Sequence, residues 1–270
     1  MRHNKGVQAD LAAAELARRR DGRHLLLLLD FDGTLVPFDP DPGAVFLPAP
    51  LHAHLSALAR HPRVTVGIVS GRRLVDLQQR ISIPGVVLAG LHGLEIDARG
   101  ERFIHPGAAG TSATIRRIAA DVQPELAGMA GVFIEDKKLS IVLHYRDASS
   151  ETAERAQSIF RAAARADVDA GRVRLLPGAC VVELLPAVSW DKGHAVSWIR
   201  ARIERAHGPT FPVYIGDDVT DEDAFRAIGP GGMAIVASGR ARGAAFQLDG
   251  PEGVSRLLHS LDGSEDHRRA

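Results

Sequence analysis

Residues 24–35 read HLLLLLDFDGTL, and this stretch decides the fold. The five consecutive leucines Leu25–Leu29 are typical of a strand buried on both faces, as in a parallel sheet covered by helices. Asp30 then stands where the strand ends, at the edge where open α/β sheets bind ligands. Asp32 follows two residues later, and Gly33 allows the chain to turn away sharply. The stretch therefore predicts a buried strand that delivers two carboxylates to a binding edge.

The segments after this strand continue an alternation of helix and strand. A loop rich in proline occupies residues 37–50 and cannot form regular structure. We expect helices at 51–60 and 72–81 and strands at 64–69 and 86–89, from the spacing of their apolar residues. This βαβαβ succession predicts an α/β fold, with a parallel sheet and helices on both faces.

The pattern changes in the middle of the chain. From about residue 109 to residue 186 the expected order is helix, strand, strand, helix, strand, strand, and the first of these helices is expected at 111–126. After Pro186 the earlier alternation returns. We therefore predict a discontinuous core domain, residues 1–108 and 187–270, with residues 109–186 as an inserted α+β domain. A site is expected at the seam between the two domains.

Composition limits the classes of function. The chain has 270 residues, of which 45% are hydrophobic and 24% charged, as in ordinary globular proteins. Basic and acidic residues number 33 each, so the chain has no overall attraction for nucleic acid or an anionic membrane. Its single cysteine, Cys180, excludes an internal disulfide, and its longest aliphatic run is far shorter than the ~20 residues that cross a bilayer. We expect a cytoplasmic protein without nucleic-acid or membrane partners.

A second apolar strand, Val213–Gly216, also runs into acidic residues, Asp217 and Asp218. Capping of the following helix does not explain Asp217, which lies directly at the strand end. If the two strands are neighbours, Asp30, Asp32 and Asp217 meet at one edge of the sheet, where a cation or a shared proton must compensate their repulsion. Oxygen ligands of this charge suit Mg²⁺.

Polar groups of another kind follow a strand or begin a helix. Ser70, Gly71 and Arg72 come after the strand at 64–69 and offer a hydroxyl and free amides to an anion, although for Ser70 taken alone a helix cap is the favoured explanation. Lys192 opens a helix, where the helix dipole disfavours a cation. Its position indicates an anion nearby.

In this order the segments resemble the four motifs of the haloacid-dehalogenase-like phosphatases. The matching segments are DFDGT at 30–34, SGR at 70–72, Lys192 and GDDVTD at 216–221. Further segments are similar to those of trehalose-6-phosphate phosphatases within that superfamily, namely GLHGLE at 90–95, EDK at 135–137, HYR at 144–146 and Glu183. The resemblance covers residues 24–260. It implies a Rossmann-like core, an inserted cap of αββαββ order (the C2B type) and a bound Mg²⁺ ion.

The resemblance also implies roles for individual residues. Asp30 is the implied nucleophile, which forms an aspartyl-phosphate, and Asp32 the implied acid and then base. Lys192 compensates charge and Ser70 holds a phosphate oxygen. The implied Mg²⁺ ligands are Asp30, Asp32, Asp217 and Asp218, the last either binding through water or orienting Lys192. The implied substrate-binding residues are Gly33, Gly71, Arg72, His92, Glu135, Lys137, His144, Arg146 and Glu183.

Structural explanations remain open for the residues of the inserted domain. Each of Glu135, Lys137 and Glu183 can belong to a solvated edge with Glu–Lys pairs. His144 can be a packed structural histidine, and Arg146 can pair with Glu135 instead of touching a ligand. A mixed set of carboxylates and an ammonium nevertheless suits sugar hydroxyls, which both donate and accept hydrogen bonds.

The function that the resemblance implies is Mg²⁺-dependent hydrolysis of a small-molecule sugar phosphate, trehalose 6-phosphate. The sequence does not determine the oligomeric state, for which we favour a monomer. One alternative is another sugar phosphatase of the superfamily, acting on sucrose, glucosylglycerol or mannosyl phosphates. A phosphomutase would share the aspartyl-phosphate but return the phosphate to sugar. A phosphate-sensing module without turnover would be expected to have lost Asp30, Asp32 or Lys192, and all three are present.

Overall fold

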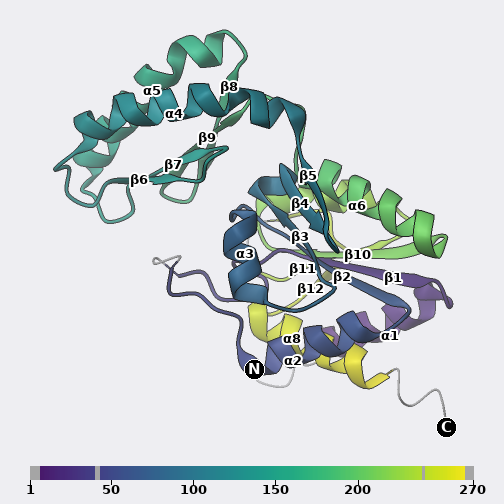
Figure 1. The fold of residues 1–270 in the computed structure, drawn as a ribbon. Coiled ribbons are helices and arrows are strands. Elements are labelled where there is room, and N and C mark those ends of the chain that lie inside the picture. The colour runs from purple at the N-terminus through teal and green to yellow at the C-terminus, as the bar shows by residue number, and fades with distance from the viewer. Residues whose placement is uncertain (1–6, 40–42, 239–240, 265–270) are drawn as a thin grey trace. The chain divides into compact units, whose positions relative to one another are not determined.

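The structure is a computed structural model that describes residues 7–39, 43–238 and 241–264 (Figure 1). The chain forms two compact units by its internal contacts. The described residues of Met1–Phe103 and Trp190–Ala270 make up unit 1, and Ile104–Ser189 make up unit 2. Each unit has a sheet and an apolar core of its own.

Unit 1 is built on an eight-stranded sheet in the order β12-β11-β10-β1-β2-β3-β4-β5. Strands β12 to β3 in this order are parallel, and β4 is antiparallel to β3. The strands are β1 His24–Leu29, β2 Val64–Val69, β3 Val87–Gly90, β4 Glu95–Ala98, β5 Glu101–Ile104, β10 Thr210–Gly216, β11 Met233–Val236 and β12 Phe246–Gln247. Because β1 lies between β10 and β2, the ends of the three strands that precede the predicted motifs are neighbours.

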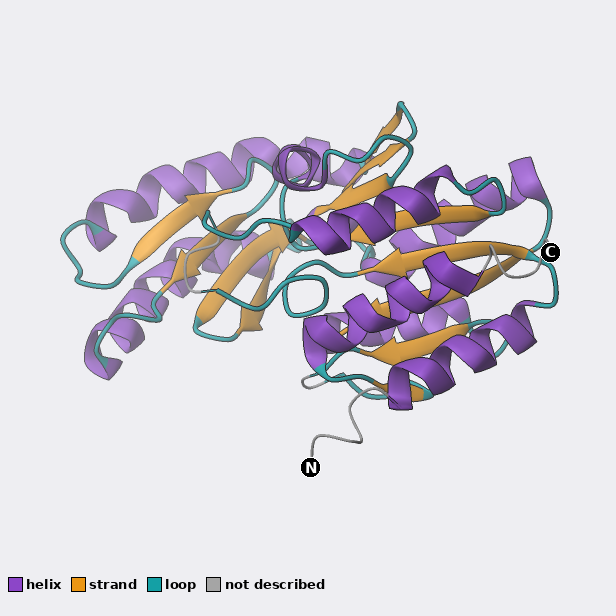
Figure 2. Ribbon diagram, turned by 90° about the horizontal axis from the view of Figure 1, so that it is seen from below, coloured by secondary structure: helices purple, strands orange, loops and turns teal. Residues whose placement is uncertain are grey.

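Helices cover both faces of this sheet (Figure 2). Leu25, Leu27 and Leu29 pack in one core with α1, α2, α3 and α8, whereas Leu26 and Leu28 pack in the other with α6 and α7. This two-sided burial explains the unbroken leucine run and confirms the predicted α/β core. The elements are α1 Val7–Arg20, α2 Ala49–Arg60, α3 Leu74–Ile81, α6 Lys192–His207, α7 Glu222–Ile228 and α8 Gly250–Ser264, with short 3₁₀ helices η1 Leu91–Gly93 and η2 Val219–Asp221. Among the described residues, no helix is both long and apolar enough to cross a membrane.

Unit 2 has the predicted αββαββ order. Its antiparallel sheet runs β6-β7-β9-β8. The elements are α4 Pro106–Leu126, β6 Phe133–Asp136, β7 Ile141–His144, α5 Ser150–Asp169, β8 Val173–Gly178 and β9 Val181–Pro186. Ile141 and Leu143 pack with α4 and α5 in the core of the unit. Because side chains alternate along a strand, Val142 lies on the opposite face, and the register places Glu135 and Glu183 on either side of it. We call this the polar face of unit 2.

The largest difference between an expected and an observed boundary is at the start of α4. Helix α4 begins at Pro106, five residues before the expected start at residue 111. The ring of His105 accepts a hydrogen bond from the Gly107 amide at 3.2 Å and so caps the helix. Proline is well suited to the first turn of a helix, where its missing amide hydrogen costs nothing. Gly107 and Gly110, both weak helix formers, concealed this extra turn in the sequence.

Candidate active site

The ends of β1, β2 and β10 bring distant polar residues to one edge of the unit 1 sheet. Leu29 is in register with Ile215 of β10 and with Ile68 of β2. The Asp30 amide still donates to the Ile215 carbonyl at 2.9 Å, so Asp30 continues the ladder by one residue. One carboxylate oxygen from each of Asp30, Asp217 and Asp221 lies within 4.8 Å of the others. Two acid-bearing segments almost 190 residues apart therefore form one acidic cluster.

Gly33 makes this approach possible. Its backbone has a φ of +81°, which disfavours other residues, and a Cβ atom built on it would lie 2.3 Å from Oδ2 of Asp217. The next residue, Thr34, donates its hydroxyl to Oδ1 of Asp217 at 3.3 Å. The loop after β1 thus holds the first carboxylate of the second acidic segment in place.

Lys192 provides the positive charge of the cluster. Its ammonium donates to Oδ1 of Asp30 at 2.9 Å and to Oδ1 of Asp221 at 2.7 Å, and the side chain is only 3% exposed. Burial opposes the charged form, but Asp221 and Asp30 outweigh burial and raise the pKa of Lys192 above its ordinary value. The anion that its position at the start of α6 indicated is this pair of carboxylates.

Asp221 is the centre of the hydrogen-bond network, a role that the sequence did not reveal. Oδ1 accepts from Lys192 and from the Tyr214 hydroxyl at 2.8 Å, and Oδ2 accepts from the amides of Asp217 and Asp218 at 2.9 and 3.0 Å. Four donors use the four lone-pair positions of the carboxylate. Although Asp221 belongs to the acidic cluster by distance, it has little capacity left to bind a metal.

The electrostatics of the cluster favour a cation. Burial raises the pKa of Asp30 well above its usual range, despite the attraction of Lys192. Burial and the nearby Asp221 raise the pKa of Asp217 to about 6. Three carboxylates face one ammonium, which leaves two formal negative charges uncompensated. A divalent cation would remove that excess, and carboxylate oxygens are ligands that hard divalent cations prefer. Asp30 and Asp217 are the residues that fit this role.

Asp32 points to a different partner. Its two carboxylate oxygens accept from Nε and Nη2 of Arg72, both at 2.7 Å, in a bidentate ion pair. Arg72 also donates from Nη1 to Asp76 at 3.0 Å, and its guanidinium lies 5.1 Å from the Phe31 ring centroid. The Asp32 carboxylate is thus held by Arg72 and is not one of the three acids whose oxygens cluster. Asp218, the fourth predicted metal ligand, joins the network through its backbone amide.

The loop after β2 is fixed by the loop after β3. The Ser70 hydroxyl accepts from the Arg72 amide at 3.2 Å, and the Ser70 carbonyl accepts from the His92 amide at 2.9 Å. A Cβ atom on Gly71 would lie 3.1 Å from the His92 ring. Leu91 and His92 both have left-handed φ angles, 51° and 57°, which cost energy in residues other than glycine. The Ser70–Arg72 segment is therefore held in place by a strained neighbouring turn.

In unit 2, the polar face gathers Lys137, Ser140 and Glu183. Ser140 donates to Oε1 of Glu183 at 2.7 Å, and the ammonium of Lys137 lies 3.7 Å from the same oxygen. Glu183 is buried, with 7% exposure. A buried carboxylate with a hydroxyl and an ammonium beside it differs from the solvated edge that was the alternative for these residues.

Glu135 and His144 form a second pair on this face. Nε2 of His144 lies 2.9 Å from Oε2 of Glu135, and the His144 ring stacks on Phe133 with centroids 4.4 Å apart. Burial works against ionisation of Glu135, but His144 and Lys137 together lower its pKa. Arg146 donates to the Ala179 carbonyl at 3.2 Å. His144 is therefore both stacked and hydrogen-bonded, and it takes the position beside Glu135 that was considered for Arg146.

Comparison with known proteins identifies relatives. A family model described as trehalose-phosphatase matches residues 28–244. The trehalose-phosphate phosphatase of Mycobacterium marinum is 36% identical over 242 residues, which are 87% of this chain and 60% of the relative. The protein of the same name from Mycobacterium tuberculosis is 35% identical over 259 residues, which are 93% of this chain and 64% of the relative. The chain thus spans somewhat less than two thirds of the length of these relatives.

Solved structures share the fold. A trehalose-6-phosphate phosphatase related protein aligns with a TM-score of 0.78 at 23% identity, covering 90% of this chain and 99% of that chain. The C-terminal domain of the Candida albicans trehalose-6-phosphate phosphatase gives the same TM-score and identity, covering 93% and 96%. The resemblance inferred from the motifs is confirmed, and the chain belongs to the trehalose-phosphatase family.

Proposed function

We propose that this chain is a Mg²⁺-dependent phosphatase that hydrolyses trehalose 6-phosphate to trehalose and inorganic phosphate. The observation that carries the proposal is the buried cluster in which Lys192 bridges Asp30 and Asp221, with Asp217 beside them. Membership of the family and the names of the mycobacterial relatives support the choice of substrate.

The acidic cluster suits a divalent cation held by Asp30 and Asp217. Both carboxylates have raised pKa values, chiefly because burial removes the water that stabilises their ionised forms. A cation in place of that water would stabilise the ionised forms again. When bound, Mg²⁺ supplies Lewis-acid compensation for the charge of the phosphate oxygens. Asp221, saturated by four donors, orients Lys192 and the backbone of Asp217.

Asp30 is the proposed nucleophile. Lys192 donates to Oδ1, which leaves Oδ2 as the oxygen that attacks phosphorus. The bond from Oδ2 to phosphorus forms while the bond from phosphorus to the sugar oxygen breaks, and Asp32 donates a proton to the leaving alkoxide. Asp32 then accepts a proton from water, which attacks phosphorus and releases phosphate from Asp30. A carboxylate needs no base to become nucleophilic at neutral pH. The main requirement on the site is therefore to compensate the negative charges of Asp30 and of the phosphate group.

The ion pair between Asp32 and Arg72 must open before Asp32 can act in the proposed mechanism. To serve as the acid, Asp32 must exchange its two hydrogen bonds from Arg72 for contact with the leaving oxygen. The freed guanidinium has the planar fork that binds phosphate oxygens in pairs. The proposed role of Arg72 in binding substrate therefore follows from the release of Asp32.

We propose that the inserted domain, residues 109–186, selects the sugar. The polar face of unit 2 offers acceptors in Glu135 and Glu183, a donor in Lys137 and a ring in His144. Such a mixed set matches sugar hydroxyls, which donate and accept hydrogen bonds.

The test is phosphate release from a panel of substrates, with and without Mg²⁺. We expect trehalose 6-phosphate to be hydrolysed with a kcat/KM at least ten-fold above those of sucrose 6-phosphate, glucosylglycerol phosphate, a mannosyl phosphate and glucose 6-phosphate. We expect EDTA to abolish release and Mg²⁺ to restore it. Faster hydrolysis of another panel member would contradict the substrate, and undiminished release in EDTA would contradict the metal.

A further inference from the structure

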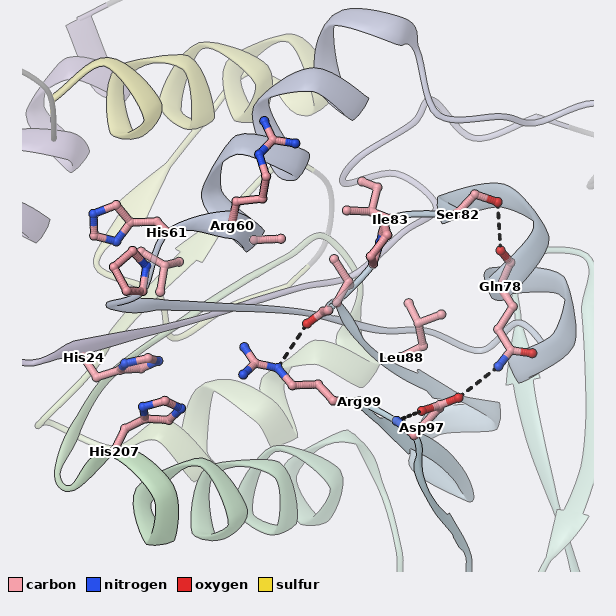
Figure 3. A pocket seen from close by; sticks show the side chains of 17 residues that line it. His24, Arg60, His61, Gln78, Ser82, Ile83, Leu88, Asp97, Arg99 and His207 are labelled. Carbon is pink, nitrogen blue, oxygen red and sulfur yellow. Dashed lines mark hydrogen bonds between the residues drawn. The ribbon is translucent and has the colours of Figure 1, made fainter.

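Unit 1 contains a cavity of about 780 Å³ at the amino-terminal edge of its parallel strands (Figure 3). His24, the first residue of β1, lines it, whereas Asp30 follows the last residue of the same strand. Six residues of extended chain separate the two, which is about 20 Å. The cavity is therefore distinct from the acidic cluster. Its volume lies in the range of small-molecule sites.

One end of the cavity is rich in cationic and imidazole groups. Arg60, His61, Arg99, His24 and His207 line it and come from β1, the end of α2, the turn between β4 and β5, and the end of α6. Figure 3 shows the guanidinium of Arg99 directed toward the two stacked rings of His24 and His207, whose centroids are 4.2 Å apart.

Thr65 connects these groups. Its hydroxyl lies 2.9 Å from Nε2 of His24 and accepts from Nη2 of Arg99 at 3.1 Å. Burial, followed by the charges of His207, Arg20, Arg99 and Arg63, lowers the pKa of His24 to about 4. These four charged neighbours are all basic, and with Arg60 and His61 they make this end of the cavity basic.

The rest of the wall is of a different kind. Among the described lining residues Asp97 alone is acidic, and it accepts from Nε2 of Gln78 at 3.1 Å and from the Gly100 amide at 2.9 Å. Between this pair and the basic end lie the side chains of Ile83 and Leu88 (Figure 3). The cavity thus combines a basic end, an apolar wall and a polar end that can bind hydroxyl groups.

We propose that this cavity is a second binding site, for a hydroxylated organic phosphate. Its phosphate group binds at the end formed by Arg99, His207 and His24, and its body extends along Ile83 and Leu88 toward Gln78 and Asp97. Guanidinium and imidazole nitrogens form charge-assisted hydrogen bonds to phosphate oxygens. The site lies at the edge of the sheet opposite to the proposed chemistry and does not depend on the proposed function.

The experiment follows the imidazole signals of His24 and His207 by NMR in the full chain during titration. The probe is the non-hydrolysable phosphonate analogue of glucose 6-phosphate, and inorganic phosphate and glucose are titrated separately. We expect the phosphonate to shift both signals in a saturable way and to raise the pKa of His24, because a nearby anion favours the protonated ring. We expect inorganic phosphate to bind at least ten-fold more weakly, and glucose to leave the signals unchanged.

Two variants and one control locate the site. Arg99→Gln removes the guanidinium at the basic end and should weaken binding of the phosphonate at least ten-fold. His207→Gln changes an exposed ring and should weaken it by a smaller factor. Arg18→Gln removes the same charge from the last turn of α1, outside the cavity lining, where the side chain is 72% exposed and pairs with Glu15, and should change nothing.

Three outcomes would overturn the proposal. In the first, neither histidine signal moves at saturating phosphonate. In the second, Arg18→Gln weakens binding as much as Arg99→Gln, which would indicate unspecific attraction. In the third, inorganic phosphate binds as tightly as the phosphonate, which would exclude a role for the body of the ligand.

Discussion

The two ends of strand β1 have opposite chemistry. At the carboxyl end, Asp30 and Asp221 are buried around a single ammonium, that of Lys192, with the partly buried Asp217 beside them. At the amino end, His24 lies among histidine and arginine side chains beside a cavity. Buried charges in direct contact depend strongly on each other, whereas partly exposed ones are screened by water. The same strand therefore carries a tightly coupled site at one end and a weakly coupled one at the other.

Replacement of Lys192 should have the largest effect. Lys192→Met leaves the buried Asp30 and Asp221 without their ammonium, so we expect turnover to be lost and the free energy of unfolding to fall by about 3–5 kcal/mol. Denaturant unfolding and phosphate release measure the two effects. In the double variant Lys192→Met/Asp221→Asn, the loss of stability should be less than the sum of the single losses. Strict additivity would show that the two charges are not coupled.

Tyr214→Phe should have the next largest effect on the free energy of unfolding, again at the carboxyl end of β1. The variant removes the hydroxyl that donates to Oδ1 of Asp221, a hydrogen bond to a charged group worth about 1.5–3 kcal/mol of unfolding free energy. The other tyrosine of the chain, Tyr145, is half-buried, and Tyr145→Phe serves as the matched control. Equal losses of stability in the two variants would contradict a specific role for the Tyr214 hydroxyl.

Glu183→Gln extends the comparison to unit 2, to which the proposed function assigns recognition of the sugar. Loss of the charged acceptor should raise KM for trehalose 6-phosphate by about ten-fold, the equivalent of about 1.4 kcal/mol, and should change kcat less. Hydrolysis of p-nitrophenyl phosphate, which has no sugar, should stay unchanged. The control is Asp136→Asn, since Asp136 is exposed at the end of β6. A parallel loss of activity toward both substrates would place Glu183 outside sugar recognition.

The contribution of His24 should be the smallest of these effects. It should appear as a dependence of the free energy of unfolding on pH. Its pKa is lowered to about 4 in the folded chain against about 6.5 in the unfolded one. Between these values the unfolded state binds a proton that the folded state does not, so the free energy of unfolding falls as the pH drops below 6.5. We expect a loss on the order of 1 kcal/mol between pH 7 and pH 5. This loss of unfolding free energy should be smaller in His24→Gln. Identical pH profiles of stability in the variant and the unmodified chain would refute the contribution of His24.

The sequence was most informative where structure is local. The leucine run before Asp30 and the apolar strand before Asp217 each specify a buried strand with an acid at its end, and a parallel sheet places such ends together. The position of Lys192 in the first turn of α6 indicated an anion because of the helix dipole. These features depend on periodicity and on residues adjacent in the chain.

The pairing of side chains from distant segments could not be predicted from the sequence, because it leaves no local pattern. Asp221 resembled an ordinary acid at the start of a helix, although the GDDVTD spacing was a signal that pointed to it. The bidentate pair of Asp32 with Arg72 depends on rotamers across two loops. The cavity at the amino-terminal edge is lined from separate elements with no common pattern in the sequence.

The most direct test of the proposed chemistry is to trap the phosphorylated residue. The chain is mixed with trehalose 6-phosphate and Mg²⁺, quenched within one turnover and reduced with borohydride, which converts an aspartyl-phosphate to homoserine. Peptide mass spectrometry then locates the converted residue, with Asp32→Asn as a variant in which the intermediate should persist. We expect homoserine at residue 30 and at no other aspartate. Conversion at another aspartate, or none in a sample that has released a full equivalent of trehalose, would contradict Asp30 as the nucleophile.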